Sequence, residues 1–223
     1  MFKGILNDVQ NYGESNMNVD ERRGRLRETL VEAALARIGA EGLSALKARD
    51  LARDAGCAVG AIYNVFPDLD ALVMTVKSRT LGAIDTAMSQ VDAAGTSLPP
   101  AERLERLGLA YLEFAMLEPR LWRCLFEHRL PDDYEVPAWY TDQLADLFRH
   151  LMLPLAELFP RREPAERGEM AQALFAGVHG IVALGLDGKL GAVTREVITG
   201  RIRFLVGAAL KGTTGTADIL SAS

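Results

Sequence analysis

Apolar residues recur at three- and four-residue spacing along most of the chain, and no segment shows the two-residue alternation of a β-strand. This pattern predicts an all-α protein in which each helix buries one face. Breaks rich in Gly, Pro or polar residues separate the helical segments. We expect about nine helices, at residues 21–39, 44–55, 59–66, 68–91, 101–117, 119–128, 138–159, 165–186 and 194–210.

The second and third of these helices are short and lie close together in the chain. Ala48, Leu51 and Ala55 mark one face of the first, and Gly56 follows where a helix commonly ends in a left-handed residue. A tight connection then leads to a helix in which Ile62 and Phe66 can pack back onto the first. Two short helices joined by a turn with a glycine predict a helix-turn-helix.

The outward positions of the 59–66 helix are Val59, Gly60, Tyr63 and Asn64. This face is small and uncharged, whereas a merely solvated helix would carry Lys, Glu and Arg. Small residues allow a close approach to a partner, and Tyr and Asn can form hydrogen bonds with it, as suits a helix in a DNA major groove. A half-buried helix of an ordinary α-domain is an equally good interpretation of these residues alone.

The segment G-C-A-V-G-A-I-Y-N-V-F-P-D-L-D-A-L, residues 56–72, resembles the recognition segment of the TetR/AcrR family of transcriptional regulators. The residues that match the family pattern are Gly56, Gly60, Ala61, Ile62, Tyr63, Phe66, Asp70 and Leu72. Three positions depart from it: Val65 replaces the usual His, Leu69 the usual Lys and Ala58 the usual Ser. The changes at Leu69 and Ala58 remove two possible phosphate contacts.

The resemblance implies an N-terminal three-helix helix-turn-helix DNA-binding domain and a C-terminal helical bundle for regulation and dimerisation. On this basis we expect a disordered tail at residues 1–20, the DNA-binding domain at 21–83, the ligand-binding and dimerisation domain at 84–212 and a flexible tail at 213–223. Met17 lies just before the first expected helix, so translation could start at Met1 or at Met17.

Basic residues gather in the part of the chain that carries the helix-turn-helix. Residues 21–80 hold ten Lys and Arg against eight Asp and Glu, whereas the whole chain has a net charge of −5. Arginines crowd the start of the first helix, where they oppose its dipole, so a phosphate partner or a solvated basic face would explain them. The residues expected to contact DNA are Arg22, Arg25, Lys47, Arg49, Ala58, Val59, Gly60, Tyr63 and Asn64.

The second half of the chain is rich in aromatic residues, most of which core packing can explain. The segments 110–128 and F-A-G-V-H-G (175–180) resemble a variant C-terminal domain with a Trp-His-Gly signature, in which Phe175 stands at the Trp position. In such regulators the second domain holds a ligand cavity. The candidate pocket residues are Tyr111, Phe114, Trp122, Phe126, Phe148, Phe175 and His179, although apolar neighbours also fit a core or interface role for His179.

Small residues form a stripe on the 165–186 helix. Several glycines in one helix indicate close packing, because each costs about 1 kcal/mol relative to Ala. Regulators of this family dimerise through their last two helices, and packing within one chain explains the stripe equally well. The candidate dimer residues are Ala173, Ala176, Gly177, Gly180, Ala183 and Leu184.

Several classes of function lack support in the sequence. Cys57 and Cys124 have no metal-ligand spacing and form no disulfide framework, which favours a reducing cytoplasm. Three histidines stand without a neighbouring nucleophile motif, and there is no Gly-rich phosphate loop. We therefore expect no enzymatic activity, no metal, no cofactor and no membrane partner.

The sequence thus predicts a homodimeric repressor that binds a palindromic double-stranded DNA operator and is released from it by an unknown small, hydrophobic effector. The alternative is a DNA-binding protein of the same family whose second domain is regulated by a protein partner.

Overall fold

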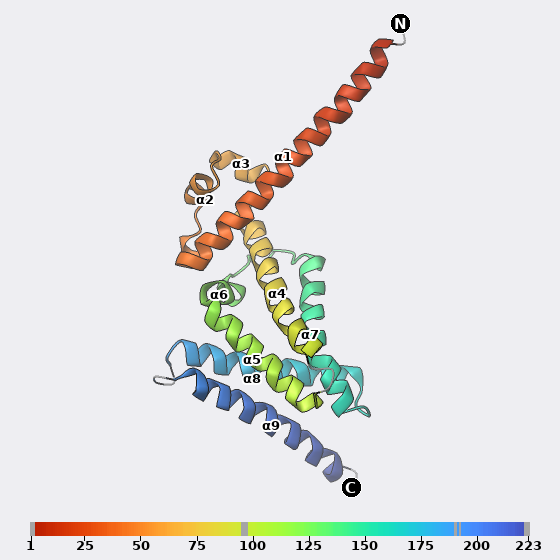
Figure 1. Ribbon diagram of the computed structural model, residues 1–223, viewed down its shortest axis with the longest axis vertical. Coiled ribbons are helices and arrows are strands. Elements are labelled where there is room, and N and C mark those ends of the chain that lie inside the picture. The colour runs from red at the N-terminus through yellow and green to blue at the C-terminus, as the bar shows by residue number, and fades with distance from the viewer. Residues whose placement is uncertain (1–2, 95–97, 190, 192, 221–223) are drawn as a thin grey trace. The chain divides into compact units, whose positions relative to one another are not determined.

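The computed structural model describes residues 3–94, 98–189, 191 and 193–220, and over these residues the chain is helical and has no β-strand (Figure 1). The predicted all-α class is therefore confirmed. The elements are α1 (Lys3–Glu41), the short 3-10 helix η1 (Leu43–Ala45), α2 (Ala48–Asp54), α3 (Val59–Tyr63), α4 (Leu69–Ala94), α5 (Pro100–Leu117), α6 (Pro119–Glu127), α7 (Ala138–Leu158), α8 (Pro164–Leu186) and α9 (Arg195–Leu220).

The two ends of the chain differ from the prediction. Residues 3–20 belong to α1 and residues 213–220 to α9, where the sequence predicts tails without structure. Extending an existing helix costs far less than starting one, because each added residue gains a hydrogen bond. A polar segment without periodicity can therefore still be helical where it directly continues a well-packed helix. The remaining predicted tail residues, 1–2 and 221–223, lie outside the described residues.

The chain divides into two compact units, and two of the three divisions fall inside helices, while the third falls in the loop before α7. The first unit comprises residues 1–77 and 123–134, and the second comprises residues 78–122 and 135–223. The sequence predicts a boundary between residues 83 and 84, but α4 continues across this point without interruption. Residues 123–134 join the first unit through packing: Cys124 is buried, and His128 Nε2 lies 2.9 Å from Asp70 Oδ1 on α4.

The core of the first unit is built from one face of each of its helices. Arg37 of α1 also bonds to α2, since its Nε donates to Asp54 Oδ2 at 2.7 Å. Asp68 caps α4 by accepting a hydrogen bond from the Ala71 backbone N–H at 2.6 Å. The largest fully buried side chains here are Leu30, Ile38, Leu51, Ile62, Phe66, Leu72 and Met74.

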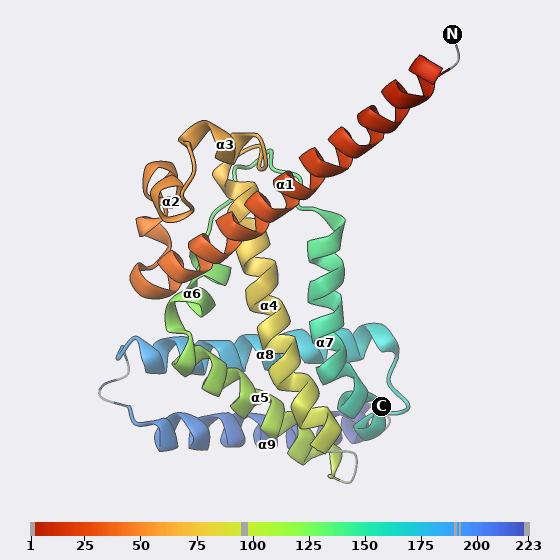
Figure 2. The ribbon, with the colours of Figure 1, turned by 45° about the horizontal axis from the view of Figure 1, so that its top comes forward.

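Glycines bring the helices of the second unit into close contact. A Cβ added at Gly108 of α5 would lie 2.9 Å from Ile202 Cγ2 of α9, and one at Gly185 of α8 would lie 2.8 Å from Ile198 Cδ1. Figure 2 shows α8 and α9 running antiparallel, side by side. The backbones can approach this closely only because the glycines have no side chain.

By length and composition, α8 is also the single helix among the described residues that could cross a membrane, with a mean hydropathy of 1.4. Packing accounts for part of this apolar character, because Leu174, Val178 and Val182 are buried within the unit. Other positions of α8, among them Ala173, Ala176 and Leu184, are exposed.

Polar side chains link α4 and α7 at two levels. Ser78 Oγ donates to Gln143 Oε1, and Gln143 Nε2 donates to the Ser78 carbonyl, both at 2.8 Å. His150 Nε2 lies 2.8 Å from Asp85 Oδ1. Both levels join residues 65 apart in sequence, so the two pairs support the same register between the helices.

The glycine contacts generate a prediction about stability. We expect Gly185→Val to destabilise the fold by about 1–3 kcal/mol more than Gly168→Val does, because overpacking a close helix contact strains it. Gly168 lies on the same helix, and a Cβ there would meet no atom within 4 Å. The free energy of unfolding, measured by urea denaturation, checks this; equal values for the two variants would mean that Ile198 moves aside without cost.

Candidate nucleic-acid interface and apolar pocket

The turn between α2 and α3 is a Schellman motif centred on Gly56. Gly56 has a φ of 65°, in the left-handed region, as the sequence predicts for this position. Its N–H donates to the Arg53 carbonyl at 3.2 Å, and the Cys57 N–H donates to the Ala52 carbonyl at 2.9 Å. These bonds satisfy the last carbonyls of α2 and set the direction in which the chain continues.

Helix α3 is shorter than predicted and depends on its buried side. It ends at Tyr63, while the sequence predicts an end at Phe66. The Phe66 N–H still donates to the Ile62 carbonyl at 2.8 Å, so one further turn follows the helix. Ile62 and Phe66 are almost fully buried, which holds α3 against the core of the first unit.

The outward face of α3 is open, as predicted. Tyr63 is 49% exposed and Val59 38% exposed, and a Cβ at Gly60 would meet nothing within 4 Å. Ala58 and Asn64 are exposed as well. The structure therefore brings five of the predicted DNA-contacting residues onto one small, uncharged, accessible surface.

The four predicted basic contacts are exposed too, on α1 and around the start of α2. They are Arg22, Arg25, Lys47 and Arg49. Arg25 forms a 3.6 Å ion pair with Glu21 one turn away, and because both side chains are largely exposed this pair is weak. Arg27, from the same basic run, has a structural role: its guanidinium lies 4.4 Å from the centre of the Phe66 ring and donates to Thr75.

In the second unit, aromatic rings from four helices, α5, α6, α7 and α8, form a cluster. Tyr111 of α5 has edge contacts with Trp122 of α6 and Phe175 of α8, with ring centres 6.1 and 5.7 Å apart. His179 stacks on Phe175, and Phe148 of α7 meets Phe175 edge-on. These are five of the seven side chains that the sequence predicts for the pocket, and the structure brings these five together.

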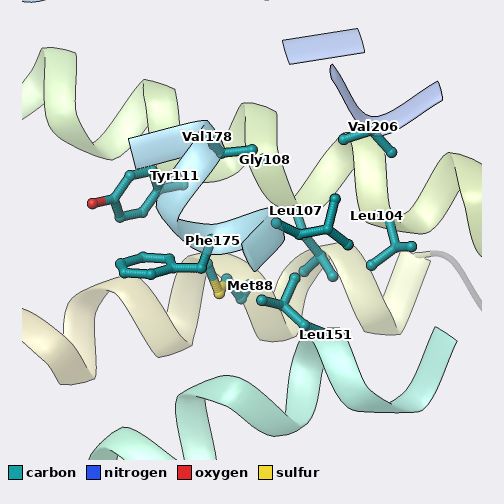
Figure 3. Close-up of a pocket in the computed structure, with 10 residues that line it drawn as sticks. Met88, Leu104, Leu107, Gly108, Tyr111, Leu151, Phe175, Val178 and Val206 are labelled. Carbon is teal, nitrogen blue, oxygen red and sulfur yellow. The ribbon is translucent and has the colours of Figure 1, made fainter. Parts of the chain in front are cut away.

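A pocket adjoins this cluster (Figure 3). The pocket is small. The volume that the centre of a water molecule can reach is about 30 Å³, which is room for roughly two waters. Only Tyr111 and Phe175 of the predicted pocket residues line it. The prediction rests on aromatic rings and misses the aliphatic lining, which helical periodicity could have indicated. The other lining residues are Met88, Leu104, Leu107, Gly108, Leu151, Leu174, Val178 and Val206.

Tyr111 and His179 form a neutral hydrogen-bonded pair at the edge of the pocket. The Tyr111 hydroxyl oxygen lies 2.9 Å from His179 Nδ1. Burial raises the pKa of Tyr111 and lowers the pKa of His179. Both shifts disfavour the charged form, so at pH 7 the phenol is protonated and the imidazole is neutral.

Two predicted pocket residues lie elsewhere. Phe114 faces an open groove between α4 and α5, which Val91 and Arg106 also line. Phe126 belongs to the first unit and is 46% exposed. Phe114 lies three residues from Tyr111 and Phe126 lies four residues from Trp122, so helical spacing alone does not predict which of these rings joins the cluster.

The three histidines lie apart from one another and each bonds a different side chain. His128 bonds Asp70, His150 bonds Asp85 and His179 bonds Tyr111. Within the described parts of the chain, no group of three or more His, Cys, Asp and Glu residues is arranged to hold a metal ion.

The predicted dimer stripe on α8 divides between two roles. Ala173, Ala176 and Leu184 are exposed, Ala183 is half-exposed, and a Cβ at Gly180 would meet no atom within 4 Å. A Cβ at Gly177, by contrast, would lie 2.6 Å from Leu205 Cδ2 of α9. Gly177 therefore serves packing within the chain.

Helix α9 also carries exposed apolar side chains, which are not among the residues predicted for the dimer interface. Phe204 is 78% exposed and Val197 is 44% exposed. Their spacing of seven residues, two helical turns, puts them on one face of α9. This spacing was visible in the sequence, but it does not distinguish an exposed apolar face from a buried one.

Two family models match the chain. The model of the bacterial regulatory proteins of the tetR family matches residues 30–75, and a tetracyclin repressor-like C-terminal domain matches residues 104–206. The description of the second model names no Trp-His-Gly subtype, so that finer assignment stays a prediction. The comparison with curated proteins finds no match.

Solved structures share the fold. A protein of unknown function from Rhodococcus sp. RHA1 superposes with a TM-score of 0.68 at 20% identity, over 84% of this chain and 94% of that one. A TetR transcriptional regulator from the same organism has a TM-score of 0.58 at 16% identity, over 84% and 97%. RolR in complex with the ligand resorcinol has a TM-score of 0.61 at 15% identity, over 86% and 88%. With its helix-turn-helix and both family models, the chain belongs to the TetR family of bacterial transcriptional regulators.

Proposed function

We propose that this TetR-family protein is a cytoplasmic transcriptional repressor that leaves its operator when a small, hydrophobic effector binds in the second unit. The observation that carries the DNA-binding part is the open face of α3, which has no charged side chain and presents Tyr63 and Asn64. The role requires binding alone, and we propose no catalytic step.

In this proposal α3 lies in the major groove of DNA. Ala58, Val59 and Gly60 allow the backbone to approach the groove closely, Asn64 hydrogen-bonds a base edge, and Tyr63 contacts a phosphate. Arg22, Arg25, Lys47 and Arg49 bind phosphates on either side and supply affinity that does not depend on base sequence.

The operator is palindromic because one recognition helix offers too few base-reading side chains to specify one site, so two copies act together. We propose that the copies associate through the exposed small face of α8 and the apolar face of α9. The first comprises Ala173, Ala176, Gly180, Ala183 and Leu184, and the second Val197 and Phe204. A partner copy there would also cover the exposed side of the apolar helix α8.

The effector part rests on the apolar pocket beside the ring cluster. RolR, which shares the fold, was solved with resorcinol, a small compound, and this supports a small ligand here. A ligand releases DNA only if it binds the released state more tightly than the DNA-bound state. Helix α6 is suited to pass on such a difference, since Trp122 belongs to the ring cluster while residues 123–127 belong to the first unit.

The alternative regulator is a protein partner. It would use exposed apolar side chains such as Leu117, which is 78% exposed, or Trp139, which is 47% exposed. An apolar pocket within the second unit favours the small ligand, because small-molecule sites are concave and mostly apolar, whereas a protein partner binds a broader surface.

The base-reading role of Asn64 can be tested directly. We expect Asn64→Ala to relax base preference at one position of each half-site and to weaken operator binding by about 1–3 kcal/mol. The measurement is a binding selection from random DNA with both proteins. An unchanged preference would remove Asn64 from the base contacts.

Phosphate contacts have a different signature. Neutralising Arg49 as Arg49→Gln should weaken binding to all sequences alike and reduce the salt dependence of log K by about one unit per contact. Arg149→Gln is the matched control, since Arg149 is an exposed arginine of the second unit. A parental salt slope for Arg49→Gln would show that this side chain stays outside the interface.

The dimer face yields a third test. A bulky side chain in a close helix contact pushes the helices apart, so Gly180→Leu should lower the dimer fraction and the operator affinity together. Gly168→Leu, on the same helix but outside the stripe, is the control. Sedimentation velocity gives the dimer fraction, and circular dichroism checks the fold. A fully dimeric Gly180→Leu would mean that the copies associate elsewhere.

A further inference from the structure

We infer that the effector is an uncharged, mainly apolar compound, and that Phe175 and Leu151 are the side chains that yield to admit it. This inference rests on the proposed function, because it describes the ligand of the same pocket. It goes further in stating which chemical class the lining accepts and which it rejects.

The lining has almost no polar atoms. Side chains of five helices, α4, α5, α7, α8 and α9, surround the space, and among them only Tyr111 carries an oxygen or nitrogen atom. Figure 3 shows the Tyr111 hydroxyl at one end of the lining residues, on the side away from Leu104 and Val206. A ligand in this space would therefore meet carbon and sulfur atoms on most of its surface.

The one polar group is already engaged. The Tyr111 hydroxyl is within hydrogen-bond distance of His179 Nδ1, at 2.9 Å. Because burial keeps this pair neutral, it offers no charge to a ligand ion. Moving a charged group from water into such surroundings is strongly unfavourable without a partner charge.

Two pairs of polar side chains join the helices around the pocket. Arg103 of α5 bonds Glu157 of α7 at 2.6 Å, and His150 of α7 bonds Asp85 of α4 at 2.8 Å. None of these four residues lines the pocket. These four side chains therefore offer no direct partner to an ion in the pocket.

Size determines how the ligand enters. Space for about two waters is too small for a ring compound, so binding must widen the pocket. Phe175 and Leu151 are the only lining side chains that are half-exposed, while the other lining residues are buried. These two can move toward solvent at the least cost in packing.

The experiment compares three probes that share one ring: benzyl alcohol, benzoate and benzylamine, with the last two ionised at pH 7. Thermal unfolding of the full chain is followed at increasing probe concentration, since a ligand of the native state raises Tm. We expect benzyl alcohol to raise Tm and the two ions to bind at least about 100-fold more weakly, given the cost of burying a charge.

A pocket-filling variant locates the binding site. Leu151→Phe should abolish the Tm shift by benzyl alcohol, whereas Leu117→Phe, the same change at an exposed position of α5, should leave it intact. If Leu151→Phe does not fold, the comparison of the three probes with the unaltered protein still decides.

Two results would overturn the inference: benzoate or benzylamine binding as well as benzyl alcohol does, or no shift with benzyl alcohol. Benzoate binding that is lost in Arg106→Gln would move the site to the groove between α4 and α5, where Arg106 lies. The proposed function is tested separately with operator DNA. If benzyl alcohol binds in the pocket but the protein stays bound to operator DNA, the inferred class of ligand is supported. The proposed release of DNA by an effector is then contradicted.

Discussion

The position of α3 in the first unit depends on the burial of Ile62 and Phe66, because a helix this short does not persist by itself. A helix of five residues closes hardly more than one turn, and isolated helices of this length do not form in water. Its position therefore comes from the core contacts of these two residues and from the turn at Gly56. Since the buried side supplies the stability, the outward side is free to carry Gly60, which is a poor helix former.

Much of this arrangement could be read from the sequence. Helical periodicity located the helices of both units, because an amphipathic helix repeats its apolar residues wherever one face is buried. The turn was predictable because Gly56 stands where a left-handed residue is needed. Helix ends were harder to place: α3 stops at Tyr63 although Phe66 continues the apolar spacing, since a buried residue need not lie within the helix.

Periodicity could not separate the two kinds of glycine in α8. Gly177 and Gly180 lie on adjoining rows of the same helix, and both lower its stability relative to Ala. Only the fold shows that Leu205 fills the space beside Gly177, while the space beside Gly180 is open. The pocket lining was missed for a related reason: Leu107 and Val178 look like any other core residue until their neighbours from distant parts of the chain are known.

Two helices, α4 and α6, contribute residues to both compact units. The division falls after Lys77 in α4 and after Trp122 in α6, at points where the backbone is continuously helical. A helix transmits a displacement along its axis better than a loop does, because its backbone hydrogen bonds resist bending. Ser78 and Asp85 bond α4 to α7 on one side of its division, and Asp70 bonds His128 on the other. Trp122 and Arg123 therefore follow one another in the same helix although they belong to different units.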